Sequence, residues 1–331
     1  MAAEALLLDV RGLKTQFFSD EGIVRAVDGV DLALRTGEAL GLVGESGCGK
    51  SVFARSLMRL LPPGGRIVEG GIRFRGENLA AKSEAEMRAL RGREMSIVFQ
   101  DPLTTLDPTM RVGAQIGEPL RAHGMARTGQ AARPRVLELM DAVRIPSPQD
   151  RYRQYPHEFS GGMRQRAIIA AALACRPSLL ICDEPTTALD VTVQAQILDL
   201  LREIKERQGM AILFISHDLG VVSRICQRVA VMYAGRVVEV GAAQNVLAKP
   251  LHPYTQGLLR CVPSVRARRE LRPIPGEVPN PLALPPGCKF NPRCPFVQDR
   301  CRATEPLLFS VPDPPSERLV RCVLYDKGAP S

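Results

Sequence analysis

The most constraining feature of this chain is the segment Gly44-Glu-Ser-Gly-Cys-Gly-Lys-Ser51, which fits the pattern G-x-x-x-x-G-K-[ST] at every fixed position. It follows a short apolar run, residues 38–44, and precedes a stretch of helical periodicity, residues 50–61. Glycines let such a loop curl so that successive backbone N–H groups point inward, and the helix N-terminus adds its positive end. The pattern therefore predicts a strand–loop–helix unit that binds phosphate, in which Lys50 reaches the β- and γ-phosphates of a nucleotide and Ser51 holds Mg²⁺.

Strand and helix patterns alternate on both sides of this loop. Residues 179–182 and 211–215 are buried-strand patterns, and residues 192–208 form a crossover helix between them. Strand, helix and strand in this order indicate a parallel sheet covered by helices, so the expected fold class is an α/β P-loop core. The remaining strands, which include an antiparallel portion, are expected at residues 5–18, 24–44, 95–99 and 228–241, the last as a pair that turns at Ala234-Gly235.

Two regions depart from this alternation. Helical periodicity dominates residues 101–176, which predicts a helical subdomain inserted into the core. More than half of the chain's 27 prolines lie from residue 250 onward, and proline excludes long helices and central strands. We therefore expect a nucleotide-binding domain over residues 1–250 and a Pro/Cys-rich extension over residues 251–331 that needs its cysteines to be ordered.

Composition limits the possible partners. The formal net charge is +9, so an anionic partner such as nucleotide phosphate or an anionic membrane surface is plausible. The chain has no Trp, 5 Tyr and 10 Phe, which is too few aromatic residues to favour base stacking, and no nucleic-acid partner is expected. No apolar run is long enough to span a bilayer, and the first ten residues do not resemble a secretory signal.

Two further segments carry chemistry. Asp183 and Glu184 follow the apolar run 179–182, so their carboxylates are expected at the carboxyl end of a strand, where ligands bind in such sheets. There Asp183 could bind Mg²⁺ and Glu184 could polarise an attacking water as a general base. Ser160-Gly-Gly162 begins a predicted helix, with Ser160 as its N-cap, and offers backbone N–H groups to a second anion.

The order of these elements carries a resemblance to a known family. The chain presents, in sequence, the phosphate loop, Gln100 in Phe-Gln-Asp-Pro, Ser160-Gly-Gly162, Asp183-Glu184, Ala188-Leu-Asp190 and His217 in Ile-Ser-His-Asp. This order resembles the ATP-binding cassette (ABC) ATPases. More narrowly, residues 155–166, residues 252–259 and the Cys-rich tail resemble the ATP-binding subunits of dipeptide/oligopeptide importers, a group that includes nickel importers.

The resemblance implies a role for each matching residue. ATP would be held by Gly44, Glu45, Ser46, Gly47, Cys48, Gly49, Lys50 and Ser51, with Phe18 stacked on the adenine, and Mg²⁺ by Ser51, Gln100 and Asp183. Glu184, His217 and Gln100 would be catalytic, with His217 at the γ-phosphate. Asp190 would lie in the D-loop between two ATPase subunits. The signature motif, Ser160, Gly161, Gly162 and Met163, would contact the partner's ATP, although Met163 stands where the family usually has Gln.

The last four cysteines are spaced Cys288-x5-Cys294-x6-Cys301-x20-Cys322. This spacing lacks the C-x2-C pair of common zinc sites and differs from the common ferredoxin spacings. From the residues alone, zinc, an iron–sulfur cluster and free thiols all stay open. The family resemblance favours a [4Fe–4S] cluster, with Zn²⁺ as the alternative.

The function that the resemblance implies is ATP hydrolysis that drives import of di- or oligopeptides, or a related solute. The expected partners are two transmembrane permeases, a second ATPase subunit (identical or not) in a head-to-tail pair, and an extracytoplasmic solute-binding protein. The expected location is the cytoplasmic face of the membrane, as a peripheral subunit. Two alternatives are a soluble ABC ATPase that acts on nucleic acid or ribosomes and a nucleotide-binding module without turnover.

Overall fold

The computed structural model describes residues 6–101, 105–187, 189–261, 273–313 and 316–326. Ala188 of the D-loop motif lies outside these ranges. The chain divides into two compact units. Unit 1 holds the described residues of 35–38 and 81–214, and unit 2 holds those of 6–34, 39–80 and 215–331.

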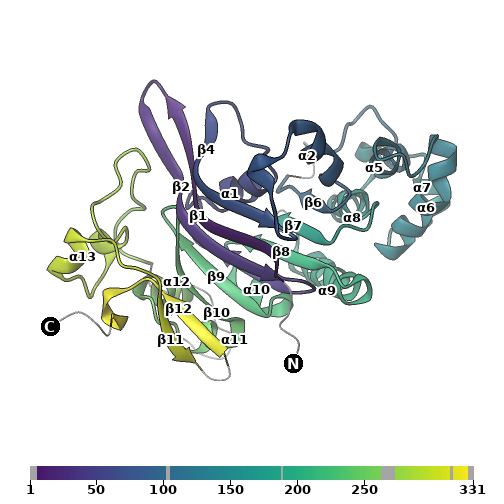
Figure 1. Ribbon diagram of the computed structural model, residues 1–331. Helices are drawn as coiled ribbons and strands as arrows, with labels where there is room; N and C mark the ends of the chain where they lie inside the picture. The colour runs from purple at the N-terminus through teal and green to yellow at the C-terminus, as the bar shows by residue number, and fades with distance from the viewer. Residues whose placement is uncertain (1–5, 102–104, 188, 262–272, 314–315, 327–331) are drawn as a thin grey trace. The chain divides into compact units, whose positions relative to one another are not determined.

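Unit 2 contains a four-stranded antiparallel sheet, with the strands in the order β2-β1-β4-β5 (Figure 1). Its strands are β1 (Leu6–Ser19), β2 (Gly22–Arg35), β4 (Gly65–Phe74) and β5 (Glu77–Asn78). Leu8 lies opposite Phe74 and Val10 opposite Ile72, and all four side chains are buried. These pairs form one apolar face, as expected for an antiparallel sheet with one buried side.

A second set of strands in unit 2 runs in the order β11-β12-β10-β9-β3. Their bounds are β3 (Ala39–Val43), β9 (Arg228–Tyr233), β10 (Arg236–Ala242), β11 (Phe309–Asp313) and β12 (Ser316–Val320). β3 is buried throughout and pairs in parallel with β9, Val43 lying opposite Val231. The turn between β9 and β10 is at Ala234-Gly235, as predicted, and both residues have positive φ, which a two-residue type I′ hairpin turn requires.

The tail differs from expectation because it adds an interior strand, β12, between β11 and β10. β12 contains no proline, whereas Pro312 lies in the edge strand β11, where a missing N–H is tolerated. The buried guanidinium of Arg318 binds the buried carboxylate of Glu239 in β10 at 3.0 Å. Unit 2 therefore holds residues from both sides of the domain boundary predicted at residue 250.

The helices of unit 2 are short. They are α1 (Lys50–Leu57), α10 (Leu219–Ile225), α11 (Ala243–Ala248), α12 (Pro253–Arg260) and α13 (Asp299–Ala303), with 3-10 turns η1 (Leu79–Ala81), η3 (Asn291–Arg293) and η4 (Val323–Tyr325), η1 ending in unit 1. α1 is shorter than the predicted 50–61, because Arg59 adopts φ 51° ahead of Pro62-Pro63. α12 begins with His252 as its N-cap.

Unit 1 contains the parallel pair β6 (Met95–Val98) and β7 (Leu179–Asp183), with β8 (Ala211–Ser216) on the other side of β7. Met95 lies opposite Leu179 and Val98 opposite Cys182. The chain passes into unit 2 within β8. The crossover helix between β7 and β8 is α9 (Val191–Gln208), within one residue of the predicted 192–208.

The other helices of unit 1 are α2 (Glu84–Leu90), α4 (Val112–Ile116), α5 (Glu118–Ala122), α6 (Gly129–Ala142), α7 (Pro148–Arg151) and α8 (Gly161–Ala172), with η2 (Pro156–Glu158). Those from α4 to α8 all lie in sequence between β6 and β7 and gather into one cluster (Figure 1). This is the placement expected of an inserted helical subdomain. In the described residues, no helix is long and apolar enough to cross a membrane.

Candidate active site

The loop between β3 and α1 can be built only with glycine at two positions. A Cβ on Gly44 would overlap the carbonyl oxygen of Met232, and a Cβ on Gly49 would overlap that of Ala26. Gly49 also has φ 103°, which L side chains rarely adopt, and it is the residue from which α1 begins. The loop is therefore held close to the neighbouring backbone while its N–H groups lead into the helix.

Lys50 curls back into this loop. The residue is 4% exposed, and its Nζ donates to the carbonyl oxygens of Gly44 at 2.8 Å and Glu45 at 3.0 Å. A buried ammonium held at the mouth of a helix N-terminus is placed to meet an anion. The ammonium of Lys50 therefore lies inside the loop, and its contact with phosphate stays a prediction.

The other loop residues differ in exposure. Ser46 and Gly47 are exposed, while Ser51 is half-buried in the first turn of α1. Cys48 is buried, and burial raises the pKa of its thiol. Its carbonyl oxygen accepts from the N–H of Gly235 at 2.9 Å, so the backbone of Cys48 connects the loop to the turn between β9 and β10.

Two other predicted residues of unit 2 lie at strand ends. Phe18 is near the end of β1 and is 44% exposed, and the guanidinium of Arg66 lies 5.7 Å from the centroid of its ring. An exposed ring can stack on a base, and the contact of Phe18 with adenine stays a prediction. His217 follows β8, is exposed, and precedes Asp218, the N-cap of α10.

Unit 1 brings Gln100 and Glu184 together. Asp183 is the last residue of β7 and is buried, and Glu184 follows it with φ 49°, a strained conformation for a residue with a side chain. Gln100 Nε2 donates to Glu184 Oε2 at 3.2 Å, and the hydroxyl of Thr187 donates to the same oxygen at 3.0 Å. Two donors therefore orient this carboxylate at the end of the strand.

The predicted signature residues lie at the start of α8. Ser160 is the N-cap, and its Oγ accepts from the N–H of Met163 at 3.3 Å. A Cβ on Gly162 would stand 2.8 Å from Cγ1 of Val193 in α9. Asp190 caps α9 by accepting from the N–H of Val193 at 2.9 Å. The signature glycine and the D-loop aspartate are thus connected through one valine, a residue that the sequence analysis did not single out.

The four tail cysteines, Cys288, Cys294, Cys301 and Cys322, line one pocket together with His252 and Phe290. Burial raises the pKa of Cys288 to about 12 and that of Cys322 to about 11. Among the residues that the structure describes, no group of three or more His, Cys, Asp or Glu side chains is arranged to hold a metal ion. The predicted cysteines share a pocket, but their sulfurs are not assembled into a coordinating set.

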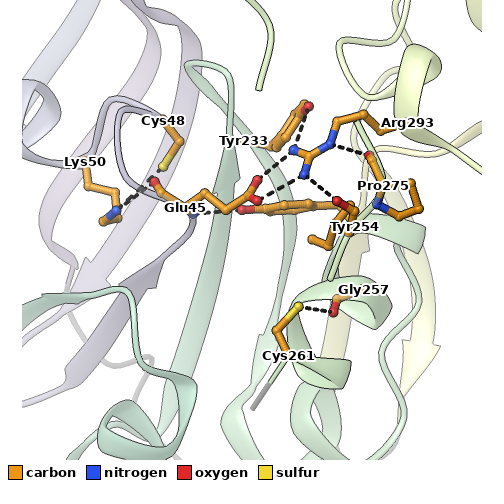
Figure 2. A network of polar contacts seen from close by, with 10 residues as sticks. Glu45, Cys48, Lys50, Tyr233, Tyr254, Gly257, Cys261, Pro275 and Arg293 are labelled. Carbon is orange, nitrogen blue, oxygen red and sulfur yellow. Dashed lines mark hydrogen bonds and ion pairs between the residues drawn. The ribbon is translucent and has the colours of Figure 1, made fainter. Parts of the chain in front are cut away.

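Glu45 of the phosphate loop has two partners that lie far from it in the sequence, and the sequence did not predict these contacts. The carboxylate of Glu45 binds Arg293 and its N–H donates to the hydroxyl of Tyr254, both in the Pro/Cys-rich extension (Figure 2). Tyr254 stands in a segment that the resemblance quoted, but Arg293 carried no local signal, because it is 248 residues from Glu45.

A glycine-lined loop between a buried strand and a helix, with a buried lysine curled into it, marks this chain as a P-loop nucleotide-binding protein. Family models narrow the class. The model for "ABC transporter" matches residues 27–187, and the model for "Oligopeptide/dipeptide transporter, C-terminal region" matches residues 238–301.

Several named proteins are similar to this chain over most of their length. The probable peptide ABC transporter ATP-binding protein y4tR of Sinorhizobium fredii is 51% identical, over 92% of each chain. The dipeptide transport ATP-binding protein DppD of Bacillus subtilis is 50% identical, over 87% of each. The oligopeptide transport ATP-binding protein OppD of Salmonella typhimurium is 50% identical, over 91% of this chain and 90% of that protein.

Solved structures agree on the fold. A dimer of the ATP-binding cassette MJ0796 in a post-hydrolysis state, bound to ADP and Pi, superposes with a TM-score of 0.64 at 26% identity, over 71% of this chain and 98% of that one. CbiO1 from Clostridium perfringens, part of the ABC transporter complex cbiONQ, gives 0.62 at 27% identity, over 74% and 92%. The chain belongs to the ATP-binding proteins of the ABC transporter family and is an ABC-type ATPase. The family resemblance drawn from the motifs is confirmed.

Proposed function

We propose that this chain hydrolyses ATP to drive import of di- or oligopeptides, or a related solute, through separate membrane permeases. The observation that carries the proposal is the match of residues 238–301 to the C-terminal region of oligopeptide/dipeptide transporters, because the cassette alone is common to many transporters. The peptide-transport names of relatives near 50% identity support the same solute class.

The contacts at Glu184 support its role as general base. Gln100 and Thr187 orient the carboxylate at the end of β7, and a carboxylate held in this way can accept a proton from an attacking water. The oxygens of Ser51, Gln100 and Asp183 are the hard donors that Mg²⁺ prefers, and the ion would neutralise phosphate charge when bound. His217 and Phe18 would contact the γ-phosphate and the adenine.

The assembly expected for such a subunit is a pair of cassettes. We infer a head-to-tail arrangement in which Ser160, Gly161, Gly162 and Met163 meet the ATP of a second cassette, identical or not, near Asp190. The capped start of α8 offers N–H groups for that contact, and the cassette MJ0796 is also dimeric. Two permeases and an extracytoplasmic solute-binding protein complete the complex, which places this chain peripherally at the cytoplasmic face of the membrane.

The proposal is tested by isolating the chain from its native cells in mild detergent and reconstituting what copurifies. Two multispanning permeases and a second cassette should copurify, and ATP hydrolysis in proteoliposomes should rise when a peptide-loaded binding protein is added. The E184Q complex should assemble but show no stimulation. Recovery with ribosomes or DNA-repair proteins, and without permeases, would instead support the soluble ABC ATPase alternative.

We also propose that Cys288, Cys294, Cys301 and Cys322 hold a [4Fe–4S] cluster, with Zn²⁺ as the alternative. Four thiols that line one pocket form a donor set that suits either group. Binding would deprotonate thiols whose pKa values burial raises, and the sulfurs would have to turn toward one another. The cluster would act as a structural staple for the proline-rich extension.

Anaerobic purification distinguishes the two groups. A cluster predicts broad visible absorbance with about four iron and four sulfide per chain, and this signal should be lost in C294S but retained in the matched variant C261S, because Cys261 does not line the pocket. Stoichiometric zinc without iron would reject the cluster, and no bound metal in freshly purified protein would reject both.

A further inference from the structure

Three parts of Glu45, the second residue of the phosphate loop, are held by other side chains. Its carbonyl oxygen accepts from Lys50 Nζ at 3.0 Å, and its N–H donates to the Tyr254 hydroxyl at 2.8 Å. Its carboxylate receives two parallel hydrogen bonds from Arg293, Nη1 to Oε2 at 2.8 Å and Nη2 to Oε1 at 3.1 Å. Two of these three contacts come from the extension, and the third connects Glu45 to Lys50, the lysine predicted to reach phosphate (Figure 2).

Arg293 is itself fixed. Its side chain is 4% exposed, while that of Glu45 is 26% exposed. Nε donates to the carbonyl oxygen of Pro275 at 3.0 Å and Nη2 to that of Ile274 at 3.3 Å, and the guanidinium lies over the ring of Tyr233. A planar guanidinium with this many partners can hold a carboxylate in one orientation, which a flexible lysine cannot do.

The aromatic residues behind this contact make it a rigid support. Tyr233 in β9, Tyr254 in α12 and Phe290 beside η3 form one buried cluster, with ring centroids 4.5 to 5.5 Å apart. Phe290 and Arg293 lie three residues apart in the extension, so the same segment that fills the cluster also supplies the ion pair. All of these residues belong to unit 2.

The negative charge of Glu45 explains why its pairing with Arg293 affects ATP binding. A carboxylate on the phosphate loop stands close to the site of a polyanion, and an unpaired carboxylate there would repel ATP. Arg293 cancels this charge and fixes the backbone whose carbonyl positions Lys50. Removing one member of a largely buried pair leaves the other charge uncompensated, which costs more than the pair contributes.

We propose that Arg293 is a positioning residue for ATP binding, which neutralises Glu45 and holds the phosphate loop in its binding conformation, with Tyr254 fixing the same residue through its backbone. The extension is thereby part of the ATP site. This inference rests on the ATPase activity of the family and not on the identity of the transported solute.

The decisive experiment compares R293M, E45Q and the double variant E45Q/R293M in the complex isolated from native cells. R293M should raise the KM for ATP about 2- to 30-fold, the range for a residue that acts through a neighbour, with a smaller change in kcat. E45Q/R293M should recover most of this loss, because it removes the unpaired carboxylate. Added salt should reduce the R293M defect by screening the repulsion.

R302M is the matched control, because Arg302 lies in the same segment and pairs with Asp299 at 3.1 Å, with its side chain 58% exposed and no contact to the loop in the described residues. R302M should keep the wild-type KM.

Two results would show that the proposal is wrong. One is a wild-type KM in R293M, and the other is an E45Q/R293M variant that is as impaired as R293M both with and without added salt. If R293M does not fold, R293K still decides: lysine keeps the charge but cannot make the two parallel hydrogen bonds to Glu45, so its KM should rise about twofold or more, and a wild-type KM would overturn the proposal.

Discussion

Gln100 Nε2 lies 3.2 Å from Glu184 Oε2, so the residue that follows β6 by two positions orients the residue that follows β7. The two strands are parallel neighbours, and their carboxyl ends therefore meet at one edge of the sheet. Glu184 reaches this position with φ 49°, and backbone strain of this kind persists where surrounding contacts hold it. The contact joins two residues that the sequence placed in separate motifs.

Replacing Glu184 by Gln should lower ATP turnover about 10²- to 10⁴-fold, because the amide keeps the size of the side chain but cannot accept a proton. ATP binding should be retained. Phosphate release and equilibrium binding of a fluorescent ATP analogue measure the two effects. E206Q, an exposed change on α9, serves as the control. Turnover at the wild-type rate in E184Q would show that Glu184 is not the base.

Replacing Lys50 by Ala should weaken binding of MgATP about ten- to a hundredfold, the value of a charge-assisted hydrogen bond. The ammonium is held between two loop carbonyls, so its loss also loosens the loop. Titration calorimetry of the nucleotide gives the affinity. K249A, which removes an exposed ammonium outside the loop, should bind normally. Equal affinity in K50A and K249A would contradict the phosphate-binding role.

Replacing Gly49 by Ala should lower the free energy of unfolding by about 1–3 kcal/mol, since the new Cβ meets the carbonyl oxygen of Ala26 at a φ of 103°. Chemical denaturation of the purified chain measures this change. G129A is the matched control, because a Cβ there meets nothing within 4 Å. The steric argument fails if both alanines are tolerated equally.

Replacing Gly162 by Ala should cost about 1–3 kcal/mol of stability, because the added Cβ stands 2.8 Å from Cγ1 of Val193. Here the obstacle is a side chain, so V193A should relieve it. Thermal unfolding of G162A, V193A and the double variant forms a complete cycle. Purely additive losses would mean that α8 and α9 do not meet at this pair.

Several elements of the fold were predictable because their signals are local. The buried strand before the phosphate loop, the crossover helix α9 and the turn at Ala234-Gly235 each follow from periodicity or from turn chemistry within a few residues. The composition of the tail was less informative. Proline content predicted the absence of interior strands, but Ser316–Val320 is free of proline and is anchored to β10 by the buried pair of Arg318 and Glu239.

By itself the sequence determined the phosphate loop, the order of the motifs and the ATPase family, since each depends on residue types at short spacing. Only the tertiary structure decided that Arg293 holds Glu45 across 248 residues, and that Gln100 meets Glu184 across 84. Such contacts depend on which chain segments pack together, and that packing is a property of the whole core that leaves no local pattern.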